Sequence, residues 1–127
     1  MKKTHPTPAH QDKRGAITDL LENEEINAIT VISFARGAVR ANHVHKLTTQ
    51  WNYVLSGRIR LVTQTGSGPV VETLLEKGDL AETVPNESHA LEAIEEAELM
   101  VFTKGPRGGK EYESDTFRLD TPLIPNS

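Results

Sequence analysis

The sequence predicts an all-β fold with no substantial helix, either a barrel or a sandwich of antiparallel strands. About eight short runs rich in β-branched and aromatic residues fill the middle of the chain, with a turn signal roughly every eight to twelve residues. No stretch of ten or more residues carries an apolar repeat of helical period. The length of 127 residues is typical of one domain. We expect a single barrel domain over residues 15–127, preceded by a flexible polar arm over residues 1–14.

The first half of the chain supplies the clearest strands. Residues 15–21 (GAITDLL) are too short for periodicity to distinguish a strand from one helical turn. Residues 28–35 (AITVISFA) are rich in β-branched side chains and predict the first confident strand. Residues 50–55 (QWNYVL) and 58–64 (RIRLVTQ) both alternate, and we expect Ser56-Gly57 to join them as a hairpin.

The later strands are shorter and lie between polar turns. The turn TGSGP precedes a strand over residues 70–75. Residues 80–84 and 90–94 are expected to pair around the turn at residues 85–88. The apolar run at residues 99–103 completes the set, before a loop rich in glycine and lysine.

Composition excludes several classes of protein. The chain has no cysteine, which rules out a disulfide framework and a thiolate metal site, so any metal must use nitrogen and oxygen ligands. The net charge is −4 and no long basic run is present, which argues against a nucleic-acid partner. No apolar run approaches the roughly 18 residues of a membrane span, and no signal-peptide core is visible. We therefore expect a cytoplasmic protein with no membrane partner.

Three histidines and one glutamine predict a metal site. In an extended segment, His43 and His45 point to the same face, about 6–7 Å apart along the strand. Gln50 follows at the start of the next strand, and His89 lies far downstream. A metal-sized pocket inside a barrel accounts for all four residues, although imidazoles that bind no metal and act as acids or bases remain an alternative.

Strand alternation adds weaker pocket candidates. If Gln50 points inward, Asn52 shares its face. Arg40 lies near the entry to the histidine segment and can bind an anionic group, with a solvated surface arginine as the alternative. Phe102 is expected to be a pocket wall or a core residue.

Residues 37–57 resemble the first motif of the cupin family. The chain carries G-x5-H-x-H-x4-Q-x6-G where cupins have G-x5-H-x-H-x3,4-E-x6-G, so Gln50 is the one departure. Residues 78–89 resemble the second motif, G-x5-P-x-G-x2-H. There Pro85 comes one place late and Asn86 replaces the glycine.

This resemblance implies a small single-domain cupin, an RmlC-like antiparallel jelly-roll barrel that is often a homodimer. By motif position it implies one divalent metal ion held by four ligands and acting on a small-molecule ligand. The implied ligands are His43, His45, Gln50 and His89. The segments KRGAITDLL and FTKGPRGGKEYESDTFRL are also similar to small cupins associated with sugar and surface-polysaccharide pathways.

The Gln50 departure affects the expected chemistry. An amide oxygen is neutral, so a metal held by three imidazoles and Gln50 keeps its full charge and is a stronger Lewis acid. Such ligands suit Zn, Ni or Cu, while Mn and Fe stay open. The set differs from the two-histidine, one-carboxylate site of iron oxygenases, unless Glu82 or Glu87 restores a carboxylate.

Three functions remain open from sequence. The first is a metal-dependent isomerase or epimerase acting on a small polar, sugar-related substrate. The second is a cupin dioxygenase. The third is a non-catalytic module that binds or senses a small molecule.

Overall fold

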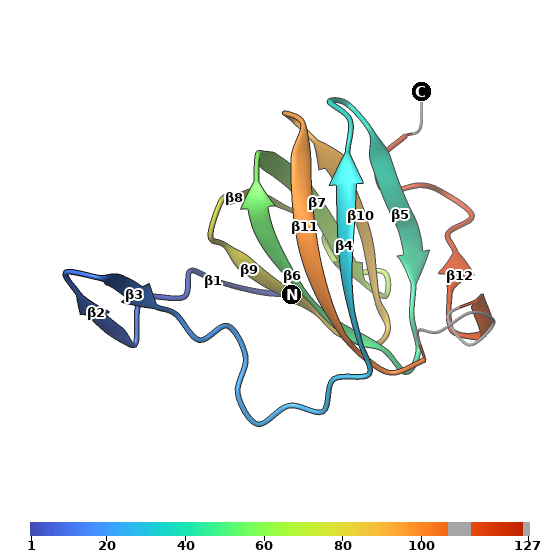
Figure 1. Ribbon diagram of the computed structural model, residues 1–127. Helices are drawn as coiled ribbons and strands as arrows, with labels where there is room; N and C mark the ends of the chain where they lie inside the picture. The colour runs from blue at the N-terminus through green and yellow to red at the C-terminus, as the bar shows by residue number, and fades with distance from the viewer. Residues whose placement is uncertain (107–112, 126–127) are drawn as a thin grey trace.

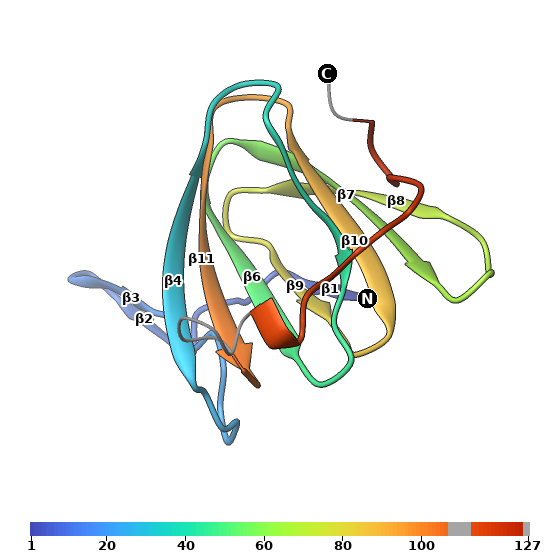
Figure 2. The ribbon, with the colours of Figure 1, turned by 90° about the vertical axis from the view of Figure 1, so that its right-hand side faces the viewer.

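The computed structural model describes residues 1–106 and 113–125. Its strands are β1 (Lys2–Thr4), β2 (His10–Asp12), β3 (Gly15–Ile17), β4 (Ala28–Phe34), β5 (Val39–Val44), β6 (Thr49–Ser56), β7 (Arg58–Thr65), β8 (Val71–Glu76), β9 (Leu80–Thr83), β10 (Glu87–Ala93), β11 (Ala97–Lys104) and β12 (Phe117–Arg118). One antiparallel sheet has the order β1-β9-β6-β11-β4, and the other has the order β12-β5-β10-β7-β8. The two sheets face each other as the halves of a barrel (Figures 1 and 2). The predicted all-β fold is confirmed, since helical conformation within the described ranges is confined to residues 113–114.

The predicted hairpin at Ser56-Gly57 is wrong. β6 pairs with β9 and β11 in one sheet, while β7 pairs with β10 and β8 in the other. The expected pairing of residues 80–84 with 90–94 fails in the same way, because β9 and β10 also lie in opposite sheets. Each strand has one apolar face, and the chain buries both sets of faces by crossing between sheets at these corners. A turn signal alone does not distinguish such a corner from a hairpin, as the true β7–β8 hairpin shows.

The apolar core fills the space between the sheets. Val54 on β6 and Leu99 on β11 meet Leu61 on β7 from the facing sheet, and all three are fully buried. Alternation along β6 sends Trp51 and Tyr53 to the opposite side of the sheet from Val54.

Part of the predicted N-terminal arm lies on the barrel. Lys2–Thr4 form β1 along the edge of β9, and the His5 ring hydrogen-bonds the Asp79 carboxylate at 2.8 Å. Of the two alternatives for residues 15–21, the strand holds at Gly15–Ile17, which is β3. The sequence does not predict β2 or its pairing with β3 in a hairpin, which stands clear of the barrel with all its residues exposed (Figure 1). The division into a flexible arm and a barrel domain stays a prediction.

The C-terminal segment packs along the second sheet. β12 pairs with β5, and Ile124 is buried against Val62 and Ala90. The Asn42 side chain anchors this segment by donating to the Ile124 carbonyl at 2.8 Å and accepting from the Leu123 amide at 2.9 Å. In Figure 2 the segment runs diagonally across β5 and β10. Within the described residues, no helix is long and apolar enough to cross a membrane.

Candidate metal centre

Two neighbouring strands bring the predicted histidines together. His43 on β5 and His89 on β10 are register partners across the ladder, and His45 follows directly after β5. The ring centroid of His43 lies 4.6 Å from the ring centroid of His45 and 4.6 Å from that of His89. One nitrogen from each of the three rings lies within 4.8 Å of the others. The structure therefore clusters the three imidazoles that the sequence grouped.

The backbone around His43 is less regular than the sequence suggests. Ala41 and Asn42 have φ values of 73° and 58°, in the left-handed region, and the ladder shifts register beside His89. Asn42 tolerates this conformation better than most residues, and its buried side chain is held by the C-terminal segment. The histidine segment is thus a kinked strand, fixed by tertiary hydrogen bonds.

Hydrogen bonds orient two of the rings. Nδ1 of His45 donates to the backbone carbonyl of Asp115 at 2.7 Å, and Nδ1 of His89 faces the Glu87 carbonyl at 3.4 Å. A carbonyl only accepts, so in the neutral rings these Nδ1 atoms carry the proton and the Nε2 atoms carry the lone pair. Three imidazoles with this spacing and support fit a divalent ion, because modest side-chain rotations bring such nitrogens to the usual distance of about 2.1 Å.

Burial keeps the imidazoles in the form that binds metal. Desolvation, with repulsion from His89, His45 and Arg118, lowers the pKa of His43 to about 3. Desolvation and repulsion from His45 lower the pKa of His89 to about 4, although its bond to the Glu87 carbonyl opposes the shift. Both rings are therefore neutral at pH 7, which metal ligation requires.

The metal-free protein is expected to lose stability as the pH falls from about 6.5 towards 4. Histidine titrates near 6.5 in an unfolded chain, so in this window the unfolded chain binds protons that folded His43 and His89 do not. The free energy of unfolding therefore falls with falling pH. Urea unfolding at several pH values measures the slope, which His89→Gln should make shallower. Parallel pH curves for parent and variant would contradict the assigned shift.

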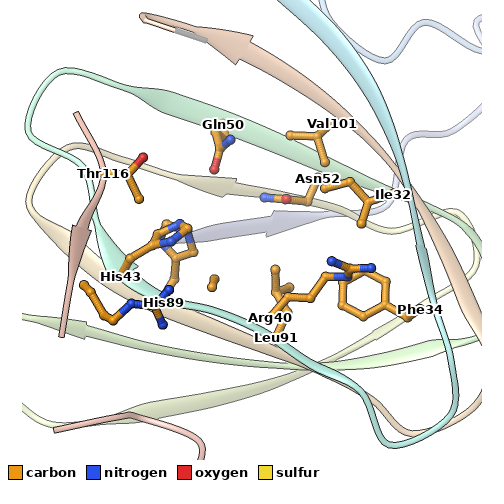
Figure 3. Close-up of a pocket in the computed structure, with 12 residues that line it drawn as sticks. Ile32, Phe34, Arg40, His43, Gln50, Asn52, His89, Leu91, Val101 and Thr116 are labelled. Atoms are coloured by element: carbon orange, nitrogen blue, oxygen red, sulfur yellow. The ribbon is translucent and has the colours of Figure 1, made fainter. Parts of the chain in front are cut away.

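A cavity of about 410 Å³ adjoins the histidines. Gln50 and Asn52 enter it from β6, across from His43 and His89 (Figure 3). Figure 3 places Phe34 at the far end of the cavity from the imidazoles. Gln50 thus lines the same cavity as His43 and His89, and its ligation of a metal stays a prediction.

Of the remaining pocket candidates, Arg40 lines the cavity and Phe102 does not. Arg40 donates to the Ser33 carbonyl at 2.9 Å, and its guanidinium lies 5.2 Å from the Phe34 ring centre. Val101 takes the wall position expected for Phe102, because alternation along β11 turns Phe102 to the opposite face. The sequence does not show which residues of this strand face the cavity, because residues 99–102 are all apolar.

The C-terminal segment contributes residues that the sequence analysis missed. Thr116 and Arg118 line the cavity, and Asp115 supports His45. These residues fall outside both motifs, and the similarity of residues 102–119 to other small cupins covers them without giving any of them a role. The basic side chains of Arg107 and Lys110, in the preceding glycine-rich loop, are further candidates from the sequence for contact with an anionic substrate, and both lie outside the described residues.

The two glutamates that could supply a carboxylate ligand are engaged elsewhere. Glu82 accepts from the Trp51 indole at 2.9 Å, and Glu87 accepts from the N-terminal amino group of Met1. In the described part of the chain, the candidate metal group contains histidines alone among His, Cys, Asp and Glu side chains.

The family comparison agrees with this architecture. The model of the Cupin domain family matches residues 30–103, which include the three histidines and Gln50. The chain belongs to the cupin family. Among curated proteins, this cupin is 30% identical over 76 residues to the pectin degradation protein KdgF of Dickeya dadantii (strain 3937). The match covers 60% of this chain and 64% of that relative, so it spans less than two thirds of the relative's length.

Solved structures share the cupin barrel at low sequence identity. QdtA, a sugar 3,4-ketoisomerase from Thermoanaerobacterium thermosaccharolyticum, has a TM-score of 0.77 at 16% identity, covering 94% of this chain and 88% of that chain. The WlaRB TDP-quinovose 3,4-ketoisomerase from Campylobacter jejuni has a TM-score of 0.77 at 18% identity, with coverages of 93% and 92%. The RmlC epimerase of Mycobacterium tuberculosis has a TM-score of 0.72 at 15% identity, with coverages of 86% and 65%. These likenesses show the fold.

Proposed function

We propose that this cupin binds one divalent metal ion through His43, His45 and His89, with Gln50 as the fourth ligand. The observation that carries the proposal is the cluster of three imidazole nitrogens within 4.8 Å. When bound, the metal would act as a Lewis acid on a carbonyl or enediol of the substrate. Imidazole and amide ligands favour Zn, Ni or Cu, with Mn and Fe as weaker matches.

We further propose isomerase- or epimerase-type chemistry on a small, sugar-related substrate. A cavity of about 410 Å³ is in the range used for small molecules. The names of the relatives support a sugar-related role, since they include a pectin degradation protein, two ketoisomerases and an epimerase.

The cavity lining favours a substrate with an anionic group. Arg40 and Arg118 belong to its described lining, which contains no aspartate or glutamate. A divalent ion held by neutral ligands would add two positive charges beside them. A carboxylate or phosphate on the substrate would balance this charge, with the arginines orienting it.

Deuterium exchange tests the proposed reaction. The zinc- or nickel-loaded protein is incubated in D₂O with ketoses, sugar acids and nucleotide-linked keto sugars, and the mixtures are followed by NMR. Metal-dependent exchange at the carbon beside the carbonyl, with formation of an isomer, is the expected result. Oxygen consumption with an iron-loaded protein would favour the dioxygenase. A ligand that binds tightly and is recovered unchanged would favour the binding module.

Replacing Gln50 by glutamate is expected to tighten divalent-metal binding by about tenfold or more, because a carboxylate adds charge attraction that the amide lacks. Gln50→Leu, which has no oxygen, should weaken binding. Competition titration with a chelating dye measures both variants beside the parent. Equal affinities in all three proteins would show that Gln50 is not a ligand.

We also propose a homodimer. Ile29 and Val31 on β4 are 64% and 56% exposed, and they extend an apolar outer face of the sheet that includes Phe102 and Met100. A second copy of the chain is the expected partner for this face. Sedimentation that shows only a 14.0 kDa species would contradict the dimer.

A further inference from the structure

Asp115 is a buried carboxylate in the C-terminal segment that contacts the residues directly after His45. It is 3% exposed, and it accepts from the backbone amides of Lys46 at 3.0 Å and Leu47 at 3.0 Å. The Thr48 hydroxyl donates to the same carboxylate at 2.6 Å. Three consecutive residues of the chain therefore hold this one side chain.

These three bonds supply the buried carboxylate with hydrogen-bond donors inside the protein. A buried anion with several donors is held firmly, because breaking one bond leaves charge without a partner in a poorly solvated place. The carboxylate thus fixes the path of the chain after His45.

The backbone of the same residue contacts the His45 ring. The Asp115 carbonyl accepts from Nδ1 of His45 at 2.7 Å. We propose that Asp115 is a positioning residue for the metal ligand His45, with its carbonyl fixing the ring and its carboxylate fixing the loop that carries the ring. This inference rests on the proposed metal site, because metal binding is the reason to position His45. The orientation of the His45 ring does not itself require a bound metal.

The consequence is a defined tautomer of His45. With the proton held at Nδ1, the lone pair of the neutral ring is on the buried Nε2. Bonds of this kind to the far nitrogen of a ligand set both ring orientation and basicity. A loop free to move would populate both tautomers and several ring rotations.

Metal binding and docking of the C-terminal segment should then favour each other. The segment that carries Asp115 also supplies Thr116 and Arg118 to the cavity wall. A ligand that binds better when the segment is docked must stabilise docking by the same free energy. Metal should therefore slow hydrogen exchange at the amides of Lys46 and Leu47, which donate to Asp115.

The test compares Asp115→Asn and Thr48→Val with Asp120→Asn, a control at an exposed residue of the same segment. NMR correlations between ring protons and ring nitrogens report the His45 tautomer in the metal-free proteins. Competition titration reports zinc affinity. The expected results are one tautomer, with Nδ1–H, in the parent and the control, and a mixture in Asp115→Asn. Zinc affinity should fall about 10- to 100-fold in Asp115→Asn and less in Thr48→Val.

An Nε2–H tautomer in the parent would overturn the inference, as would parental tautomer and zinc affinity in Asp115→Asn. If Asp115→Asn does not fold, Thr48→Val, which keeps the charge and removes one donor, decides the matter by the same two measurements. If the parent protein binds no zinc, the proposed metal site is contradicted. The tautomer of His45 and its response to the variants would still decide the positioning role.

Discussion

Replacing Gly57 by alanine is expected to lower the free energy of unfolding by about 3 kcal/mol or more, among the larger effects of single substitutions. Gly57 is the corner where the chain crosses from β6 to β7, and its φ of +78° is one that L residues rarely adopt. A Cβ there would lie 2.2 Å from the Glu96 carbonyl oxygen and 2.7 Å from the Ala97 Cβ. The backbone at the start of β11 would have to move to accept it, which would disturb the contact between the two sheets.

Gly37→Ala is the matched control. Gly37 has almost the same backbone conformation, with φ +81°, but no atom lies within 4 Å of an added Cβ. The free energy of unfolding of Gly37→Ala should fall only by the cost of placing alanine in the left-handed conformation, about 1–2 kcal/mol. Urea unfolding of the parent and both variants measures the difference. Equal losses of stability in the two variants would mean that the close approach of Glu96 and Ala97 to Gly57 does not contribute to the effect.

Replacing His45 or His89 by alanine is expected to reduce divalent-metal affinity by about a hundredfold or more, beyond the 10- to 100-fold typical of losing a supporting residue. Each ring is buried and supplies one of three clustered nitrogens. Alanine removes the nitrogen, and water is a poorer ligand for an ion that prefers imidazole. Competition titration with a chelating dye gives the affinity of each protein.

The control for this pair is His10→Ala, which removes an exposed histidine on the β2–β3 hairpin. Its metal affinity should match that of the parent. Circular dichroism should show the same strand content in all variants, which separates loss of a ligand from loss of the fold. Parental affinity in both His45→Ala and His89→Ala would contradict the assigned ligands.

The sequence was most informative where spacing is local. The strand alternation that places Gln50 and Asn52 on one face depends on neighbouring residues, and both residues line the cavity. The grouping of His43 and His45 with His89 came from motif spacing, and their contact across β5 and β10 follows from the barrel that the motifs imply.

The sequence was least informative where contacts depend on the path of the chain in space. Ser56-Gly57 has the composition of a hairpin turn, and only the arrangement of the sheets makes it a corner. Asp115 reaches His45 across 70 positions of sequence, through a segment with no periodic pattern. The sequence does not show that Val101 rather than Phe102 faces the cavity, because an unbroken apolar run does not reveal which of its residues face inward.

Elemental analysis of the protein, purified without a histidine tag and without added metal, tests the central claim most directly. The account predicts nearly one divalent metal ion per chain, and the element found selects between Lewis-acid and oxygen chemistry. A protein that holds no metal, and takes up none during dialysis against divalent ions, would contradict the assignment of His43, His45 and His89 as ligands.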